Sequence, residues 1–398
     1  MKKFYSIAAA AAAVLVAGCA KNEVIQNPND QIAVEFGVYA GRSAATKAAP
    51  IANVANLAAQ GGFGVFAYYT GTTNYASSGA TPNFMYNQQV TSGDEGVNWS
   101  YSPVKYWPNN DTNTTNNAAT FTDKLSFFAY APYVAVSLFS ENVTDGATGN
   151  TVGITHFTGN NVAQGTKNPE VTYVVATNPS QSVDFLYNDT DNTDKTKTGA
   201  TISNKISFNF KHALTRLGFT VEGVFNETDA DLNTNDVEED TKIYITSLTV
   251  TTSGSKTGGV FDLYTKEWTD NVATVSSFNV TADNIPDALK SGGTTGVTKT
   301  QVNLLKDGQF FMLIPDRDSK TYTFNIVYDV VTTDSNLVGG KSTITNNISK
   351  QASLQLLAGK AYTIRMQLGM TTVKLSATVE DWTPQSTDPI WLPINNNS

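Results

Sequence analysis

The sequence offers few side chains that could act as nucleophiles, metal ligands or general bases at neutral pH. It contains one cysteine, Cys19, and two histidines, His156 and His212. An internal disulfide, a metal site built from Cys and His, and catalysis by a pair of thiols are therefore excluded. His212 adjoins a strand-like run and is interpreted as a structural histidine, whereas His156, in a Thr/Gly-rich segment, receives no role. We predict no catalytic residue, no cofactor and no metal site.

Two short motifs are similar to ligand-binding loops but lack essential residues. Residues 339–343 read Gly-Gly-Lys-Ser-Thr, yet Ser335 stands where a phosphate-binding loop needs a glycine. Residues 229–233 supply the first three ligands of a calcium loop, but Thr234 replaces its turn glycine and Asp240 its bidentate glutamate. A strand-to-turn segment and a solvated acidic loop are the preferred interpretations. The chain is therefore not expected to be an enzyme.

Aromatic residues are frequent between positions 99 and 133. Flat rings with polar edges could form a platform on which sugars stack. The alternative, which we prefer, is that these rings belong to the core and rim of a β-sandwich. The residues concerned are Trp99, Tyr101, Tyr106, Trp107, Phe127, Phe128, Tyr130 and Tyr133.

The context of Cys19 predicts that its thiol is modified. Lys2 and Lys3 precede an apolar run over residues 7–16, which has the length of a secretory signal and is too short to span a bilayer. Residues 16–18 read Val-Ala-Gly directly before the cysteine, as in a bacterial lipobox. Residues 1–18 are thus interpreted as a signal peptide, Cys19 as the acylated residue and residues 19–30 as a tether. An ordinary signal peptide with an incidental thiol is the alternative.

Charge and length limit the possible partners and the organisation of the chain. The 26 Lys and Arg residues against 35 Asp and Glu give a formal net charge of −9. A negative field opposes binding to phosphate backbones, so nucleic acid is not expected as a partner. With 398 residues the chain is long enough for two domains. A polar stretch over residues 188–200 favours a boundary near residue 200, which gives domains 31–200 and 201–382 and a tail 383–398.

The elements that position these residues are predicted to be almost all β-strands. Ile32, Val34, Phe36 and Val38 alternate with other residues in the period of a half-buried strand. Convincing amphipathic helices are nearly absent, and short strands separated by Asn, Thr and Gly are typical of β-sandwiches. Further strands are predicted at residues 63–68, 84–90, 97–101, 125–130, 171–175, 183–187, 206–210, 217–224, 242–250, 260–263, 310–314, 322–331, 342–348, 362–368 and 373–379.

A series of short motifs follows the lipobox over nearly the whole chain. In order they are Phe63-Gly64-Val65-Phe66-Ala67-Tyr68, Tyr106-Trp107-Pro108, Leu125-Ser126-Phe127-Phe128-Ala129-Tyr130-Ala131-Pro132, Phe210-Lys211-His212-Ala213-Leu214, Met312-Leu313-Ile314-Pro315, Leu357-Ala358-Gly359-Lys360-Ala361-Tyr362 and Val379-Glu380-Asp381-Trp382. No single motif is specific, but their order resembles that of the fimbrillin family, the pilus subunits and related lipoproteins of Bacteroides-type bacteria.

The resemblance implies an all-β protein with two transthyretin-like β-sandwich domains, exported as a lipoprotein to the cell outer membrane and held there by the acyl chains, such as palmitate, on Cys19. In polymerising members a protease cuts after a basic residue and removes the first strand. The open groove then accepts a donor strand from another subunit, by β-strand addition. Carried onto this sequence, Arg42 is the cleavage residue, with Lys47 as the alternative, and residues 31–41 are the removable strand.

The tail after Trp382 is the candidate donor strand. Ile390, Leu392 and Ile394 alternate as a donor requires, although Pro389 and Pro393 each remove a ladder hydrogen bond. A short tail that caps its own domain is the alternative.

The leading functional hypothesis is a structural subunit of a cell-surface fimbria (pilus) that assembles with identical or related subunits and serves adhesion. The alternatives are an uncleaved outer-membrane lipoprotein acting as fimbrial anchor or tip adhesin, and a surface glycan-binding lipoprotein. No motif identifies a receptor on a host or bacterial surface.

Overall fold

The computed structural model describes residues 32–40, 51–78, 82–109, 121–139, 149–158, 168–197, 205–225, 240–382 and 390–392, with only the backbone at 253–255, 270–276 and 390–392. Strands dominate these residues, which confirms the predicted all-β class. Cys19, Arg42, Lys47, Ile394 and the calcium-like loop at 229–233 lie outside the described residues.

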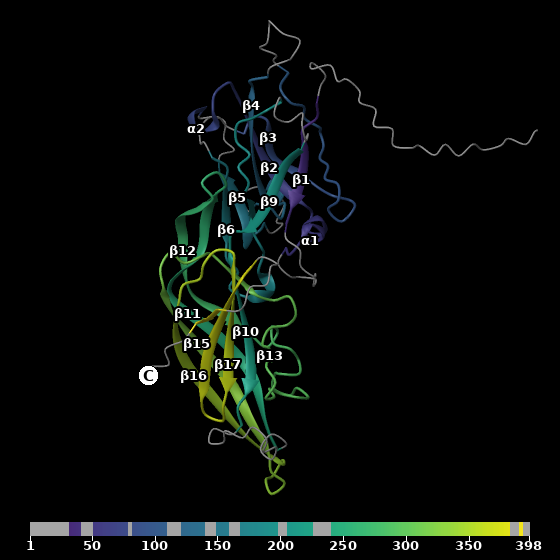
Figure 1. Ribbon diagram of the computed structural model, residues 1–398. Coiled ribbons are helices and arrows are strands. Elements are labelled where there is room, and N and C mark those ends of the chain that lie inside the picture. Colours follow the sequence, from purple (N-terminus) through teal and green to yellow (C-terminus); the bar gives the residue numbers. More distant parts are fainter. Residues whose placement is uncertain are drawn as a thin grey trace, which may run out of the picture.

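The first sheet lies at the upper end of the elongated molecule in Figure 1. Its strand order is β1-β9-β7-β4-β2-β3, and β8 pairs with β4. The pairs are antiparallel except for β1 and β9, which are parallel. The strands are β1 (Glu35–Tyr39), β2 (Phe63–Gly71), β3 (Met85–Val90), β4 (Lys124–Ala131), β7 (Leu186–Asn188), β8 (Lys195–Thr196) and β9 (Lys205–His212).

Two further sheets build the lower part of the molecule in Figure 1, except that β5 and β6 are drawn at about the height of β9. The second sheet contains β10 (Thr215–Gly223), β13 (Val302–Asn303), β14 (Phe311–Leu313), β17 (Lys360–Leu368), β18 (Val373–Asp381) and β19 (Ile390–Leu392). The third contains β5 (Gly153–Thr158), β6 (Glu170–Val174), β11 (Thr241–Asp262), β12 (Glu267–Val280), β15 (Lys320–Thr333) and β16 (Lys341–Leu354). Their apolar faces meet in one core, where Phe219 of β10 lies 6.3 Å from Phe324 of β15, centroid to centroid.

The first sheet has an apolar core on each of its faces, because successive side chains of a strand point to opposite sides. Phe127 of β4 is buried in a core that belongs to this sheet alone, together with Trp107. Phe128 and Tyr130 join the core shared with the other two sheets. These burials favour the core interpretation of the aromatic cluster, in which Tyr106 is the exposed member at 46%.

Strand pairing crosses the predicted boundary at residue 200 in both directions. β5 and β6 precede this position but join the third sheet through β11. β9 follows it but belongs to the first sheet. The division into two domains at residue 200 stays a prediction.

The short helices lie at the margins of the sheets and are α1 (Val54–Ala59), α2 (Tyr75–Ser78) and the 3₁₀-helices η1 (Val136–Leu138) and η3 (Pro179–Gln181). Asn53 caps α1, since its side-chain oxygen accepts the N–H of Asn56 at 2.8 Å. In the part of the chain that the structure describes, no helix is long and apolar enough to cross a membrane.

The prediction of a strand at residues 97–101 is wrong, since among them Ser100 alone forms a β-bridge, with Thr91. The chain bends before it, because the Asp94 carboxylate accepts the N–H of Asn98 at 2.8 Å and the hydroxyl of Ser92 at 2.7 Å. These bonds lower the pKa of Asp94 to about 2, and the bond from the Asn98 backbone has the largest effect. His156 lies in strand β5, paired with Thr172 of β6.

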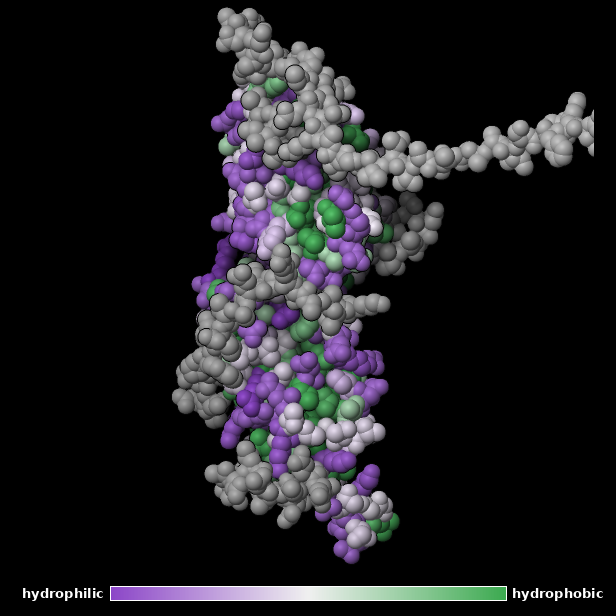
Figure 2. Space-filling view, turned by 45° about the vertical axis from the view of Figure 1, so that its right-hand side comes forward, coloured by the Kyte–Doolittle hydropathy of each residue, from purple (hydrophilic) through white to green (hydrophobic). Residues whose placement is uncertain are grey.

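The outer surface alternates between polar and apolar areas. Figure 2 shows one face on which hydrophilic side chains surround two separate apolar areas, one in each half of the molecule. Large apolar side chains are also exposed at the lower tip in Figure 1, where the loop between β15 and β16 carries Leu337 and Val338. No continuous apolar surface runs along the described part of the face in Figure 2.

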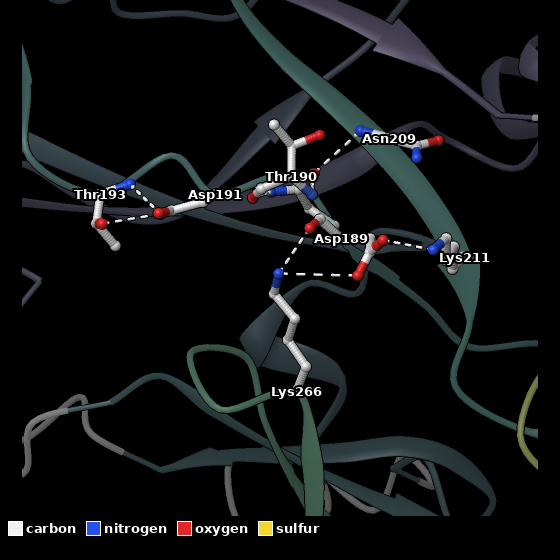
Figure 3. Close-up of polar contacts among 8 residues, drawn as sticks. Asp189, Thr190, Asp191, Thr193, Asn209, Lys211 and Lys266 are labelled. Atoms are coloured by element: carbon white, nitrogen blue, oxygen red, sulfur yellow. Dashed lines mark hydrogen bonds and ion pairs between the residues drawn. The ribbon is translucent and has the colours of Figure 1, made fainter.

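A polar cluster ties the first sheet to the hairpin between β11 and β12 (Figure 3). The Lys211 ammonium lies 2.5 Å from Oδ2 of Asp189, and that of Lys266 lies 3.7 Å from Oδ1. Lys266 also donates to the backbone carbonyl of Asp189 at 2.6 Å. The cluster thus connects β9 with the third sheet.

We expect this cluster to make stability depend on pH. The hydrogen bond from Lys211 is the main cause that lowers the pKa of Asp189 below its ordinary value. A lowered carboxyl pKa stabilises the fold above the unfolded-state pKa, and this contribution is lost as the pH falls through the folded-state pKa. Asp189→Asn should therefore lower the melting temperature at neutral pH, and the difference from the wild type should shrink in acid.

Asp287→Asn is the matched control for this series of melting curves. Asp287 also pairs with a lysine, Lys290, at 2.7 Å, but its side chain is 80% exposed. Salt and water weaken such a pair, so its removal should change the melting temperature less. A deficit of Asp189→Asn that stays constant from neutral to acid pH would contradict the assigned role of the Asp189 pair.

Candidate functional site: the first strand and its groove

The first described segment of the chain lies between two walls. On one side β1 pairs in parallel with β9, from Glu35 opposite Lys205 to Tyr39 opposite Asn209. On the other side residues 105–107 run antiparallel to it. There the N–H of Val34 donates to the carbonyl of Lys105, and that of Trp107 to the carbonyl of Ile32, both at 2.9 Å. β9 therefore holds the main chain of β1, and residues 105–107 hold the main chain of residues 32–34 directly before it.

The side chains of this segment alternate as the sequence predicts. Val34 and Phe36 are buried, with 1% and 2% of their surface exposed. Ile32 and Val38 pack partly buried against the same core. Tyr39 faces outward and is 61% exposed. One face of the strand thus fills a groove in the first sheet.

The groove is lined by aromatic rings. The ring centroid of Phe36 lies 5.3 Å from those of Phe208 and Tyr101, 6.0 Å from that of Phe127 and 6.4 Å from that of Phe63. These rings come from β9, β4, β2 and the loop before residues 105–107. Without β1, these four rings would lose their contact with Phe36.

Tyr101 connects the groove with the main chain of the first strand. Its hydroxyl donates to the carbonyl of Val34 at 2.8 Å. Burial is the main cause that raises the pKa of Tyr101, so the ring keeps its proton and its donor role at neutral pH. Tyr101 belongs to the aromatic cluster of residues 99–133, but no pattern in the sequence marks it as a residue that binds this strand.

The segment that contains Arg42 and Lys47 begins and ends at buried positions. Ala40, at the end of β1, is 3% exposed, and Ile51, where the description resumes, is 2% exposed. The N–H of Ile51 donates to Oδ2 of Asp184 at 2.8 Å. Both flanks of the predicted cleavage region are therefore fixed to the first sheet.

His212 forms part of the same anchor. Its Nδ1 lies 3.1 Å from Oδ1 of Asp184, and its ring stacks on Trp382 at 3.8 Å with an angle of 2° between the planes. This packing agrees with a structural histidine. Nothing in the sequence pattern pointed to Asp184 as the residue that holds both His212 and Ile51.

The candidate donor residues lie on a different sheet. The backbone of β19 pairs antiparallel with β18, with Ile390 opposite Val379 and Leu392 opposite Ala377. The structure therefore does not bring Ile390 and Leu392 together with the groove of their own chain. Among the residues with described positions, no group of three or more His, Cys, Asp and Glu side chains could hold a metal ion.

The described residues form an all-β protein whose first strand fills a groove in the first sheet, and comparison with known proteins places the chain further. Residues 46–382 match the family model described as Fimbrillin-like. The chain belongs to this family.

Individual relatives agree with this assignment. The chain is 27% identical over 406 residues to fimbrium subunit Fim1C of Phocaeicola vulgatus, a match that covers 95% of this chain and 96% of the relative. It shares its fold with the crystal structure of a fimbrial protein from Bacteroides vulgatus, with a TM-score of 0.62 and 23% identity over 89% of this chain and 100% of the other.

Proposed function

We propose that this protein is a structural subunit of a cell-surface fimbria that serves adhesion and assembles by donor-strand exchange. In this proposal a protease cuts after Arg42 and removes β1, and a strand from another subunit takes its place. The observation that carries the proposal is the burial of Phe36 among four aromatic rings, on a short strand at the start of the chain. The family match supports it, since the matched residues begin at position 46, after β1.

Removal of β1 would leave a site that favours binding of a replacement strand. The N–H and C=O groups of β9 that bind β1, and those of residues 105–107 that bind residues 32–34, would lose their partners, and an apolar trench would open beside them. Unpaired edges of this kind bind extended segments by β-augmentation, in which alternate side chains fill the pockets. A donor therefore needs apolar residues at every second position.

The C-terminal tail of another subunit has apolar residues at every second position, as a donor strand requires. Ile390, Leu392 and Ile394 have the same period-2 spacing as Val34 and Phe36. To act as donor the tail would have to leave its pairing with β18, which involves three residue pairs in the described part of the tail.

The N-terminal segment would deliver the subunit to the cell surface before assembly. Acyl chains on Cys19 would hold it at the outer membrane, since several chains anchor a protein stably where one does not. The cut after Arg42 would then free the subunit from its lipid. The proposed role requires no catalysis by this chain.

The N-terminal sequence and intact mass of the protein recovered from cells test this proposal. We expect sheared appendages to contain a chain that begins at Ser43 without lipid. Arg42→Ala should keep the protein in the washed membranes with acylated Cys19 at its N-terminus, whereas Lys47→Ala, the matched control, should change nothing. Acylated, uncut protein in wild-type cells would contradict the proposal and favour an anchor or tip role.

A further inference from the structure

Lys197, directly after β8, is a basic residue buried inside the first sheet. Only 1% of its surface is exposed. Its Nζ donates to Oδ1 of Asn109 and lies 4.4 Å from the centre of the Phe121 ring. Burial of an amine is costly, so such a residue is expected to have a specific role. Neither the strand groove nor the assembly scheme uses this lysine.

A second buried polar group, Asp123, adjoins the end of the same strand pair. β8 pairs with β4 at Lys195 opposite Leu125 and Thr196 opposite Lys124. Asp123 directly precedes Lys124, and Lys197 directly follows Thr196. Asp123 is 5% exposed. Its Oδ2 accepts the hydroxyl of Tyr69 at 2.7 Å.

We propose that Lys197 and Asn109 form an intramolecular amide bond. A buried amine that touches a carboxamide, with a buried carboxyl group at the end of the same strand pair, provides the groups that this reaction needs. The proposal is independent of cleavage at Arg42 and of donor-strand exchange.

The reaction balances without any co-reactant. The Lys197 ammonium transfers one proton to the Asp123 carboxylate, and the Nζ lone pair then attacks Cγ of Asn109. The C–N bond to Nζ forms, and the bond from Cγ to Nδ2 breaks. The leaving nitrogen takes up the proton from Asp123 and one proton from Nζ, and departs as ammonium. Nothing is oxidised or reduced, and Asp123 is regenerated.

The position of the bond determines which segments it would hold together. Asn109 follows the residues 105–107 that bind the chain directly before β1, and Lys197 follows β8, which pairs with β4. A covalent link would therefore tie the wall formed by residues 105–107 to the sheet through β8. This wall would then stay attached whether or not the first strand is present.

Mass spectrometry of the full-length protein after trypsin digestion tests the bond. Trypsin should release residues 106–124 joined to residues 196–205, because an acylated Lys197 is not cleaved. The joined peptide should be lighter than the sum of its two parts by one ammonia molecule. If linear peptides covering Asn109 and a cleaved Lys197 account for the protein, the proposal is wrong and Lys197 is only a hydrogen-bonded ammonium.

Variants distinguish the reacting atoms from their surroundings. Lys197→Arg should abolish the joined peptide completely, while Lys195→Arg, the matched control on the same strand, should keep it. Asn109→Asp should still form the link with loss of water in place of ammonia. Asp123→Ala should leave the folded chain uncrosslinked, with folding checked by circular dichroism. A joined peptide that persists in Lys197→Arg would overturn the assignment of the lysine.

Discussion

Replacing Phe36 by alanine in the full-length protein should lower the free energy of unfolding by about 3–5 kcal/mol. The physical reason is the cavity that the substitution leaves among the rings of Phe208, Tyr101 and their neighbours, together with the lost transfer of the Phe36 ring from water. Denaturant unfolding followed by tryptophan fluorescence measures this change. Trp107 lies in the same core and reports on it.

Tyr39→Ala is the control on the same strand. Its ring is 61% exposed and faces away from the groove. Exposed substitutions of this kind usually change the free energy of unfolding by no more than about 0.5 kcal/mol. Similar losses for Phe36→Ala and Tyr39→Ala would show that the burial of Phe36 does not stabilise the sheet.

A chain that begins at Ser43 should be much less stable than one that begins at Asp30. It lacks the buried side chains of Val34 and Phe36, each of which contributes about 1.5–3 kcal/mol. It also lacks the pairing with β9. We expect a clearly lower melting temperature, regained when a peptide of residues 31–41 is added. Equal melting temperatures for the two chains would contradict the groove.

The matched control for this experiment is the same peptide with alanine at position 36. It keeps the main-chain hydrogen bonds but cannot fill the aromatic pocket, so it should restore much less of the melting temperature. A peptide of residues 388–396 then tests the donor tail directly. Binding of this peptide to the chain that begins at Ser43, and not to the longer chain, is the expected result.

The sequence allowed the all-β class and most strands to be predicted because their side chains alternate cleanly. β1, β15 and β17 show the period-2 burial that their apolar residues predict. β4 was recognised by its aromatic run although both of its faces are buried. In these elements local pattern and tertiary packing agree, so local reasoning sufficed.

Elsewhere the tertiary pairing overrides the local pattern. Residues 242–250 and 260–263 were predicted as separate strands, but β11 is continuous across the Gly- and Ser-rich residues between them. β12 escaped prediction because several register shifts against β11 break its alternation. Such irregularities become visible only when the partner strand is known.

The sequence predicts one part of the candidate site, the first strand, and not the segments that surround it. The buried residues of the first strand follow from their spacing, whereas the walls formed by residues 105–107 and by β9 depend on long-range pairing. The anchor at Asp184 and the contact between Lys197 and Asn109 join residues far apart in the chain. No local motif marks either of them.

The long strand β11 also bears on how the molecule resists force. It runs along the long axis in Figure 1, and it pairs with β15 through residues 241–252 and with β6 through residues 258–262. A pull on the two ends of the molecule loads these ladders in shear, so that many hydrogen bonds must break together instead of one after another. Forced unfolding is governed by the unfolding rate. We therefore expect the long ladders of β11 to lower the unfolding rate of the protein under a pulling force.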